Sequence, residues 1–354
     1  MRSLVRPILA VLVCLLVTGT LSAQRGGFGV KWAGDGNSWY AVESNSIVRY
    51  ALPGFQRSVV VEASQLVPPG QSEPLPIQGY SFSEDGKKLL VYTNSKKVWR
   101  QNTRGDYWVF DLAAHTLKQL GAGRPSSSLM FAKLSPDGTK AAYTSEHNIY
   151  VEDLASGAIR QLTTDGAFRM INGTFDWAYE EEFSCRDGFR WSPDGQRIAF
   201  WQLDATRVKN FLMIDNTDSL YPFTIPVEYP VAGEAPSPCR VGVIDVATGK
   251  TTWMDVPGDD HQPEPAAARP PGPSLADCRG CTAFSGAASL GYYIPRMEWA
   301  DNSKEVVLEQ LNRKQNDAKV FLCDAASGAA RQIYEESDST WIDVKQRYSD
   351  DPTG

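Results

Sequence analysis

The stretch TFDWAYEEEFSCRDGFRWSPDGQRIAFWQLD, residues 174–204, combines a turn signal that decides the fold with an acidic cluster that points to the function. Its second half places the pair Asp194-Gly195 between the β-type segments FRW and RIAFW. An Asp-Gly pair between such segments is typical of a β-hairpin. Its first half holds three glutamates, residues 180–182, among aromatic residues rather than in a polar run. The segment therefore predicts a β-hairpin beside a site for a cationic group.

The hairpin signal recurs along the chain. Its copies are Asp35-Gly36, Asp85-Gly86, Asp137-Gly138, Asp194-Gly195 and, in degenerate form, Asp301-Asn302. The first three intervals between these copies are 50, 52 and 57 residues. A second turn, of the form Asp-x-x-Ser/Thr-Gly, follows in most units, at residues 153–157, 245–249 and 324–328. Two hairpins per unit give four strands, which is the composition of a propeller blade.

These repeats predict an all-β fold, a β-propeller of four-stranded blades. Five blade starts are visible and a sixth is expected near Trp341, so the ring is incomplete, with five to six blades and an open edge. A tryptophan precedes three of the turns, at positions 32, 191 and 299. We expect these indoles to pack between blades, and stacking on a ligand is the alternative.

The first residues predict export. Two arginines precede the apolar run 8–17, and a stretch of small residues ends at Ala23, which is the pattern of a signal peptide covering residues 1–23. The run is shorter than the roughly 20 residues that a membrane span needs. A lipoprotein anchored through Cys14 is disfavoured, because this cysteine lies inside the apolar run. We expect a soluble periplasmic or extracellular protein in which residues 24–354 form the partial propeller.

The charge balance restricts the partners. The chain has 35 basic and 42 acidic residues, and removing the two arginines of the signal peptide leaves a formal net charge of about −9. A negative protein repels polyanions. We therefore expect no binding to nucleic acid or to an anionic membrane.

A segment rich in proline, alanine and glycine, at about residues 261–290, interrupts the repeats. It predicts a disordered insertion, and retained non-coding sequence is an equal alternative. The insertion contains Cys278 and Cys281, but the chain has no second pair at zinc-ribbon spacing, so we expect neither metal nor cofactor. Together with Cys185, Cys239 and Cys323, this pair leaves five cysteines in the mature chain, for which one or two disulfides are plausible, and the pair itself is expected to be a surface disulfide or two idle thiols.

The triplet Asn172-Gly173-Thr174 matches an N-glycosylation acceptor. It lies just before the acidic segment, where a glycan would obstruct the predicted site. We expect Asn172 to stay unmodified if the site functions.

Four longer segments carry a specific family resemblance. They are DWAYEEEF (176–183), FRWSPDGQRIAFWQLD (189–204), YPFTIPVEYPVAGEAPSP (221–238) and YIPRMEWADNSKEVVLEQLNRKQN (293–316). In this order they resemble the propeller domain of dipeptidyl peptidase IV-like serine peptidases, in the prolyl oligopeptidase clan. The resemblance covers roughly residues 75–345 and implies a propeller of eight blades, of which this chain holds part.

The resemblance also implies a substrate-binding site. In the family, two glutamates of the acidic motif bind the free α-ammonium group of a peptide, and the matching residues here are Glu181 and Glu182, whereas Glu180 is expected to be structural. The segment KKVWRQNTRGDYWVFDL resembles the family's arginine segment, so Arg100 is expected to bind a substrate carbonyl and to support the glutamates. The residues after Arg100 depart from the family pattern, which leaves Arg104 as an alternative.

The catalytic machinery of the family has no counterpart in this sequence. It needs a Gly-x-Ser-x-Gly serine with an aspartate and a histidine on an α/β-hydrolase domain. No such turn occurs here, and the three histidines, His115, His147 and His261, have no plausible serine partner. We expect no catalytic residues and no peptide hydrolysis by this chain alone.

Three functional hypotheses follow. The first is the N-terminal part of an exported dipeptidyl peptidase, which recognises peptide N-termini while a missing C-terminal hydrolase domain releases dipeptides. The second is a stand-alone propeller that binds peptides without cleaving them. The third is a scaffold whose acidic segment merely packs. The resemblance also implies a possible homodimer in the full-length form.

Overall fold

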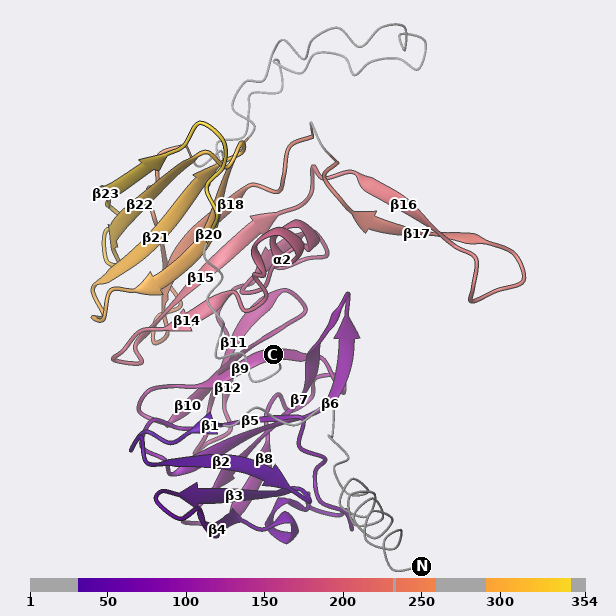
Figure 1. Cartoon of the computed structure of the whole chain (residues 1–354), viewed down its shortest axis with the longest axis vertical. Coiled ribbons are helices and arrows are strands. Elements are labelled where there is room, and N and C mark those ends of the chain that lie inside the picture. Colours follow the sequence, from indigo (N-terminus) through magenta and orange to yellow (C-terminus); the bar gives the residue numbers. More distant parts are fainter. Residues whose placement is uncertain (1–30, 232–233, 259–290, 345–354) are drawn as a thin grey trace, which may run out of the picture. The chain divides into compact units, whose positions relative to one another are not determined.

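The computed structural model describes residues 31–231, 234–258 and 291–344 (Figure 1). The predicted signal peptide and the predicted insertion, including His261 and the Cys278/Cys281 pair, lie outside the described residues. No helix in the described part of the chain has the length and apolar character of a membrane span. The chain divides into two compact units, residues 1–66 and 67–354.

The first unit contains one antiparallel sheet with the strand order β1-β2-β3-β4. Its elements are β1 (Lys31–Trp32), β2 (Ser38–Glu43), β3 (Ser46–Ala51), β4 (Gln56–Val61) and a short 3-10 helix, η2 (Ala63–Leu66). Three aliphatic side chains, Ile47, Val48 and Val61, are fully buried. Trp32 lies against Trp39 of the same sheet, with 6.0 Å between the ring centroids.

The second unit begins with two four-strand groups that join into one sheet. The first group comprises β5 (Gly79–Phe82), β6 (Lys88–Val98), β7 (Gln101–Asp111) and β8 (Thr116–Gln119); the second comprises β9 (Leu129–Leu134), β10 (Lys140–Ser145), β11 (Asn148–Asp153) and β12 (Ile159–Gln161). The long strand β7 links them, because its first half pairs with β9 while its second half pairs with β8.

Two further sheets complete the second unit. One comprises β13 (Met170–Asn172), β14 (Phe189–Trp191), β15 (Arg197–Asp204), β18 (Cys239–Asp245) and β19 (Thr251–Trp253); the other comprises β20 (Tyr292–Trp299), β21 (Glu305–Asn312), β22 (Asp317–Asp324) and β23 (Ala330–Ser337). Strands β13 and β14 pair with opposite ends of β15, so together they form one interrupted strand. The chain between them, residues 173–188, carries the single α-helix of the described residues, α2 (Trp177–Phe183).

The structure thus confirms an all-β fold of four-stranded antiparallel units. Five units are present among the described residues. Residues 341–344 contain no strand, so the sixth unit expected near Trp341 does not begin within the described residues.

Each recurring Asp-Gly turn connects the first two strands of a unit, and the three turns at Asp85, Asp137 and Asp194 are held by the same contacts. Between β9 and β10, Ser135 Oγ donates to Asp137 (2.6 Å) and accepts from the backbone N–H of Lys140 (2.9 Å). The glycine of this turn, Gly138, has φ +65°, a conformation that glycine adopts without steric cost. The equivalent serine–aspartate contacts are Ser83–Asp85 and Ser192–Asp194, both 2.6 Å long. This chemistry explains why the Ser-x-Asp-Gly pattern marks the repeat.

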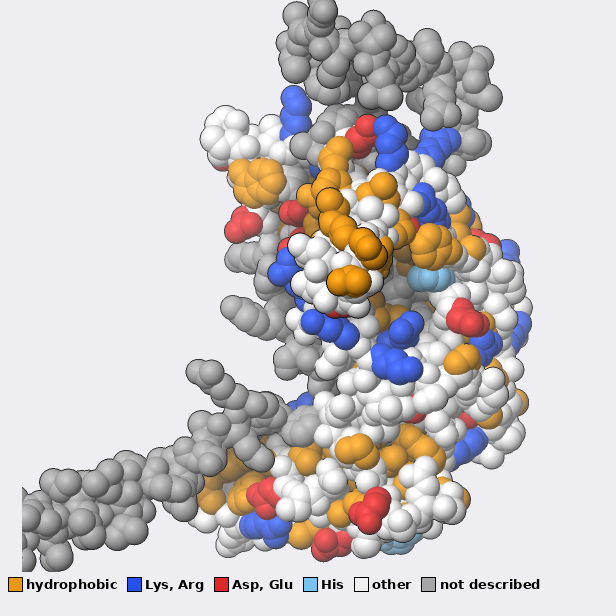
Figure 2. All heavy atoms as spheres, turned by 90° about the vertical axis from the view of Figure 1, so that its right-hand side faces the viewer, with side chains coloured by type: hydrophobic (Ala, Val, Ile, Leu, Met, Phe, Trp, Pro, Cys, Tyr) orange, Lys and Arg blue, Asp and Glu red, His pale blue; other side chains and the backbone are white. Residues whose placement is uncertain are grey.

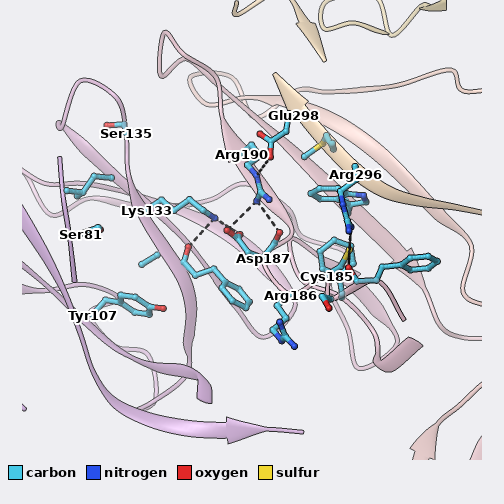
Figure 3. Close-up of a pocket in the computed structure, with 18 of the residues that line it drawn as sticks. Ser81, Tyr107, Lys133, Ser135, Cys185, Arg186, Asp187, Arg190, Arg296 and Glu298 are labelled. Atoms are coloured by element: carbon cyan, nitrogen blue, oxygen red, sulfur yellow. Dashed lines mark hydrogen bonds and ion pairs between the residues drawn. The ribbon is translucent and has the colours of Figure 1, made fainter. Parts of the chain in front are cut away.

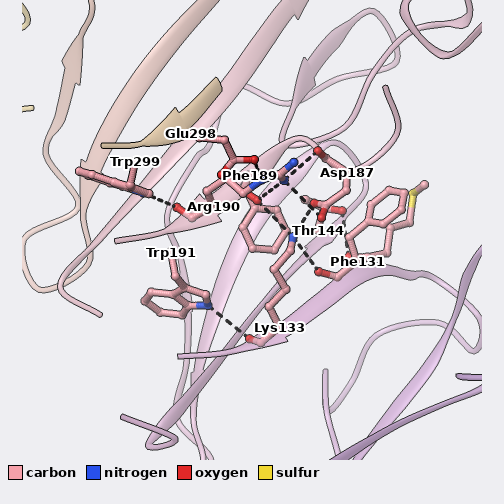
Figure 4. Close-up of polar contacts among 10 residues, drawn as sticks. Phe131, Lys133, Thr144, Asp187, Phe189, Arg190, Trp191, Glu298 and Trp299 are labelled. Carbon is pink, nitrogen blue, oxygen red and sulfur yellow. Dashed lines mark hydrogen bonds and ion pairs between the residues drawn. The ribbon is translucent and has the colours of Figure 1, made fainter. Parts of the chain in front are cut away.

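Tryptophans at the ends of first strands connect successive units. The indole N–H of Trp191 donates to the carbonyl oxygen of Lys133 in the preceding unit, and that of Trp299 donates to the carbonyl oxygen of Arg190, each over 3.3 Å (Figure 4). The expected packing between blades is therefore confirmed for these two tryptophans.

A two-stranded ribbon leaves the third sheet between β15 and β18. It consists of β16 (Asn210–Asp215) and β17 (Phe223–Glu228), paired with each other and with no other strand of the described chain. Its large apolar side chains are exposed: Phe211, Leu212, Met213, Ile214, Phe223 and Ile225, with Leu220 and Tyr221 in the connecting turn. The ribbon is therefore a candidate interaction surface.

The residues expected to form disulfides or to match a glycosylation site are buried in the structure. Cys185, Cys239 and Cys323 are buried and form no disulfide, so the expectation of disulfides is wrong for these three cysteines. Asn172 is fully buried on β13, and its amide nitrogen donates to His147 O (3.1 Å) and Asp165 Oδ1 (3.0 Å). The glycosylation motif at Asn172 is therefore inaccessible in the folded protein.

Candidate functional site

Helix α2 carries the three glutamates and is anchored at its first residue by a buried aspartate. Asp176 caps the helix by accepting a hydrogen bond from the backbone N–H of Tyr179 (3.0 Å), and it accepts a second one from Ser237 Oγ (2.6 Å). Burial raises the pKa of the Asp176 carboxyl group, although both hydrogen bonds act in the opposite direction. The helix ends at Ser184, whose left-handed backbone returns an N–H to Tyr179 O.

The helix has a buried face and an exposed face, and the glutamates divide between them. Tyr179 and Phe183 are buried, and the Tyr179 hydroxyl accepts a hydrogen bond from the backbone N–H of Ile294 on β20 (3.0 Å). Glu181 and Glu182 lie on the exposed face. Packing of the tyrosine and phenylalanine in the core therefore forces these two carboxylates outward.

Glu180 is held inside the protein. Its side chain is 10% exposed, and Arg186 Nε lies 3.2 Å from Glu180 Oε1. Burial raises the pKa of this carboxyl group, partly offset by Arg186. This placement fits the structural role expected for Glu180.

Arg100 reaches Glu181 across 81 residues of sequence. Its Nη2 lies 2.7 Å from Glu181 Oε1, and the side chains are 71% and 32% exposed, respectively. Arg100 lies in the turn of the long hairpin β6–β7, which rises from its sheet toward α2 (Figure 1). The alternative arginine, Arg104, lies opposite Lys96 in the same hairpin and makes no ion pair among the described residues. The structure therefore joins Arg100, rather than Arg104, to the acidic helix.

Glu182 completes the group that we call the carboxylate clamp: Glu181, Glu182 and Arg100. Within the described part of the chain, the Glu182 carboxylate has neither a hydrogen bond nor an ion pair, and its charge helps raise the pKa of Tyr293, which burial raises most. The clamp has two negative charges and one positive charge. It therefore has a net negative charge, and its exposed ion pair, Arg100–Glu181, adds at most about 1 kcal/mol to stability.

A cavity of about 730 Å³ lies beside the C-terminal end of α2 (Figure 3). Its charged lining includes the group that we call the inter-blade cluster: Lys133, Asp187, Arg190 and Glu298. Asp187 pairs with both Lys133 and Arg190, and Arg190 pairs with Glu298 over 3.2 Å (Figure 4). The cluster is neutral, and its charges join three successive units.

The described lining of the cavity contains neither a metal-binding group nor a reactive thiol. No group of three or more histidine, cysteine and acidic residues is arranged to hold a metal ion in the described part of the chain. The cavity-lining thiol of Cys185 has its pKa raised to about 12, chiefly by burial. A thiol with this pKa is protonated at neutral pH and unreactive.

The comparisons with known proteins place the chain in a family. The family model for the dipeptidyl peptidase IV (DPP IV) N-terminal region matches residues 83–269 and 278–350, and the chain belongs to this family. A crystal structure of Porphyromonas gingivalis dipeptidyl peptidase 4 is similar over 92% of this chain, with a TM-score of 0.75 and 25% sequence identity. That neighbour supports the assignment of the fold as part of a DPP IV-type propeller.

Curated relatives agree with this assignment but are much longer. "Probable dipeptidyl-aminopeptidase B" of Chaetomium globosum is 28% identical over 279 residues, which are 74% of this chain and 27% of the relative. "Inactive dipeptidyl peptidase 10" of Mus musculus is 28% identical over 74% of this chain and 30% of its own length. The chain therefore spans less than a third of these relatives, and 42% of the P. gingivalis chain.

Sequence reasoning missed the residues that hold the clamp in place. Asp176, Tyr179 and Ser237 fix α2 by buried hydrogen bonds. An aspartate directly before a short run with acidic residues in its first turn is a helix-start signal, so Asp176 could have been identified. The partners Ser237 and Ile294 are distant in sequence and left no local signal.

Proposed function

We propose that this chain is the N-terminal propeller part of an exported dipeptidyl peptidase and that its carboxylate clamp binds the free N-terminus of a peptide. The observation that carries the proposal is the contact of Arg100 with Glu181 (2.7 Å) beside Glu182, which has no partner among the described residues. The clamp therefore has a net negative charge at a fixed position. Membership of the DPP IV N-terminal family supports the same function.

The chemistry of the clamp suits an α-ammonium group. This group has a pKa of about 8, so it is mostly protonated at neutral pH. It offers three N–H donors, and two carboxylates accept charge-assisted hydrogen bonds from it more strongly than neutral oxygens would. Arg100 offsets the repulsion between Glu181 and Glu182, and its remaining donors can bind a peptide carbonyl.

In this proposal the chemistry belongs to an α/β-hydrolase domain C-terminal to the propeller. The clamp would hold the ammonium at a fixed distance from the serine of that domain, which limits cleavage to the second peptide bond. The predicted signal peptide supports a periplasmic or extracellular location.

A second candidate function is a peptide-binding propeller without catalysis. One relative with 28% identity is named an inactive dipeptidyl peptidase, which shows that the family includes a member so described. Sequencing the native gene beyond codon 354 separates the two candidates, because only the first requires an in-frame α/β-hydrolase domain with a Gly-x-Ser-x-Gly serine. Under both candidates we expect the purified chain to release no dipeptide from Ala-Pro peptides. Release would show catalysis by the chain itself and contradict our expectation that this chain alone is inactive.

Peptide binding tests the clamp directly. We expect the purified chain to bind a free-amine peptide such as Ala-Pro-Ala-Ala and to lose affinity by at least about 10-fold when the amine is acetylated, because a charge-assisted contact is removed. Glu182→Gln should weaken binding of the free peptide by a similar factor and leave the acetylated peptide unaffected.

The matched control is Glu43→Gln, which removes the acid of an exposed ion pair in the first unit, Arg57–Glu43 (2.9 Å). It should not change peptide affinity. Equal affinity for the free and acetylated peptides would refute the clamp.

The proposal includes a homodimer formed through the ribbon β16–β17. Both strands expose apolar side chains, and the outer edge of each strand is unpaired in the described chain; Figure 2 faces the ribbon and shows apolar side chains gathered along it. Two copies related by a two-fold axis can cover such a surface with each other. We expect Leu212→Asp with Ile214→Asp to shift the chain from dimer to monomer in analytical ultracentrifugation, whereas Val59→Asp on β4 should not.

A further inference from the structure

The turn that carries Arg100 contains an unusual residue. Strand β6 ends at Val98 and β7 begins at Gln101, so Trp99 and Arg100 form a two-residue hairpin turn. Trp99 has φ +49°, in the left-handed region. Tight hairpins need this conformation, but they normally place glycine, asparagine or aspartate there. A tryptophan in this position is a steric outlier.

The strain at Trp99 is not offset by burial. The residue remains 41% exposed at the end of the hairpin. A large apolar side chain that is strained and also exposed contributes little to folding. Strained residues of this kind concentrate at binding sites, where the surrounding structure holds them for a ligand.

The position of Trp99 relates it to the carboxylate clamp. Its neighbour Arg100 contacts Glu181 over 2.7 Å, and adjacent Cα atoms in a chain are about 3.8 Å apart. The Trp99 backbone is therefore held beside the arginine that joins the hairpin to α2. An indole at this rim can pack against the side chain of a bound residue.

We infer that Trp99 is a specificity-determining residue that contacts the side chain of the first residue of a bound peptide and favours aromatic or large aliphatic side chains over glycine. This inference rests on the proposed function of the clamp. It extends that function, because the clamp recognises only the amine and the carbonyl, which all peptides share.

The test compares two peptides, Phe-Pro-Ala-Ala and Gly-Pro-Ala-Ala, each with a free and an acetylated amine, by isothermal titration calorimetry. For the wild-type chain we expect the free phenylalanine peptide to bind about 3- to 10-fold more tightly than the glycine peptide, as an aromatic contact provides. Trp99→Asn should abolish this ratio while changing the affinity for the glycine peptide by less than about 2-fold. Trp99→Phe should keep most of the ratio.

Folding of the variants is controlled in two ways. Asparagine tolerates the left-handed conformation, so Trp99→Asn should not lower Tm, and Trp99→Gly provides a second variant that relieves the same strain. Phe55→Asn is the matched control, because Phe55 is also an exposed aromatic residue at positive φ (+54°) but lies in the first unit. It should leave the peptide ratio unchanged.

The outcomes separate the inference from the proposed function. If acetylation weakens binding but Trp99→Asn leaves the phenylalanine-to-glycine ratio unchanged, the inference is wrong and the clamp stands. If acetylation has no effect on affinity, the clamp and the inference both fail.

Discussion

Two groups of charged side chains in the second unit resemble each other in composition but differ in how their charges are used. The inter-blade cluster has two cations and two anions, and each of them is ion-paired within the cluster. The carboxylate clamp has one cation and two anions, and the cation pairs with only one of the anions, Glu181. Neutral, paired charges hold sheets together, whereas an unpaired carboxylate at an exposed site remains available to a ligand.

The secondary-structure elements that carry the two groups also differ. Three residues of the inter-blade cluster lie on strands, and only Asp187 lies in the segment between α2 and β14. Lys133 also lies 3.5 Å from the ring centroid of Phe189. The clamp is carried by a seven-residue helix and by a hairpin turn with a strained tryptophan. A site on such elements is precise only because buried residues, Asp176 and Tyr179 above all, fix the helix.

The largest effect should follow from breaking the inter-blade cluster. Asp187→Ala leaves Lys133 and Arg190 without their shared carboxylate, and we expect the free energy of unfolding to fall by about 2 kcal/mol, since these side chains are only partly exposed. Urea denaturation measures this loss. Peptide affinity should not change, and a fall in affinity as large as that of Glu182→Gln would show that the two groups are not separate.

A smaller effect on stability and a larger one on binding should follow from Arg100→Met. The Arg100–Glu181 pair is exposed, so the free energy of unfolding should change by less than about 0.5 kcal/mol. The affinity for a free-amine peptide should fall about 5-fold, because a charge-assisted hydrogen bond is lost and Glu181 is no longer positioned. Stability loss without affinity loss would make Arg100 a structural residue and reverse the comparison.

Most of the fold could be predicted from the sequence, because the repeat rests on local turn chemistry. The Ser-x-Asp-Gly turns close by contacts within about five residues, so the pattern is visible without tertiary information. The contact of Arg100 with Glu181 was expected only through the family resemblance, since 81 residues separate the partners. Periodicity alone would not have joined them.

Burial is what the local patterns did not report. The motif at Asn172 matches an acceptor for glycans, and the sequence offered only an indirect reason to expect it unmodified, whereas the strand pairing of β13 with β15 places the side chain in the interior. The cysteines could have formed bridges by number, but Cys185, Cys239 and Cys323 are separate buried thiols. The sequence also did not show that β13 and β14 are two parts of one interrupted strand. Only their pairing with the same strand, β15, reveals this, because the segment that carries α2 separates them in the chain.

The smallest expected effect concerns Asp176, which anchors the helix that carries the clamp. Its carboxyl group should make the free energy of unfolding depend on pH. Burial raises the pKa of Asp176 in the folded protein above its unfolded value. The corresponding stability is fully present below the unfolded pKa and is lost as the pH rises through the folded pKa. In urea denaturation between about pH 3.5 and 7, wild-type stability relative to Asp176→Asn should therefore decrease with increasing pH. A difference that is constant over this range would mean that the aspartate ionises as in the unfolded chain, and that its hydrogen bonds to Ser237 and Tyr179 fully compensate its burial.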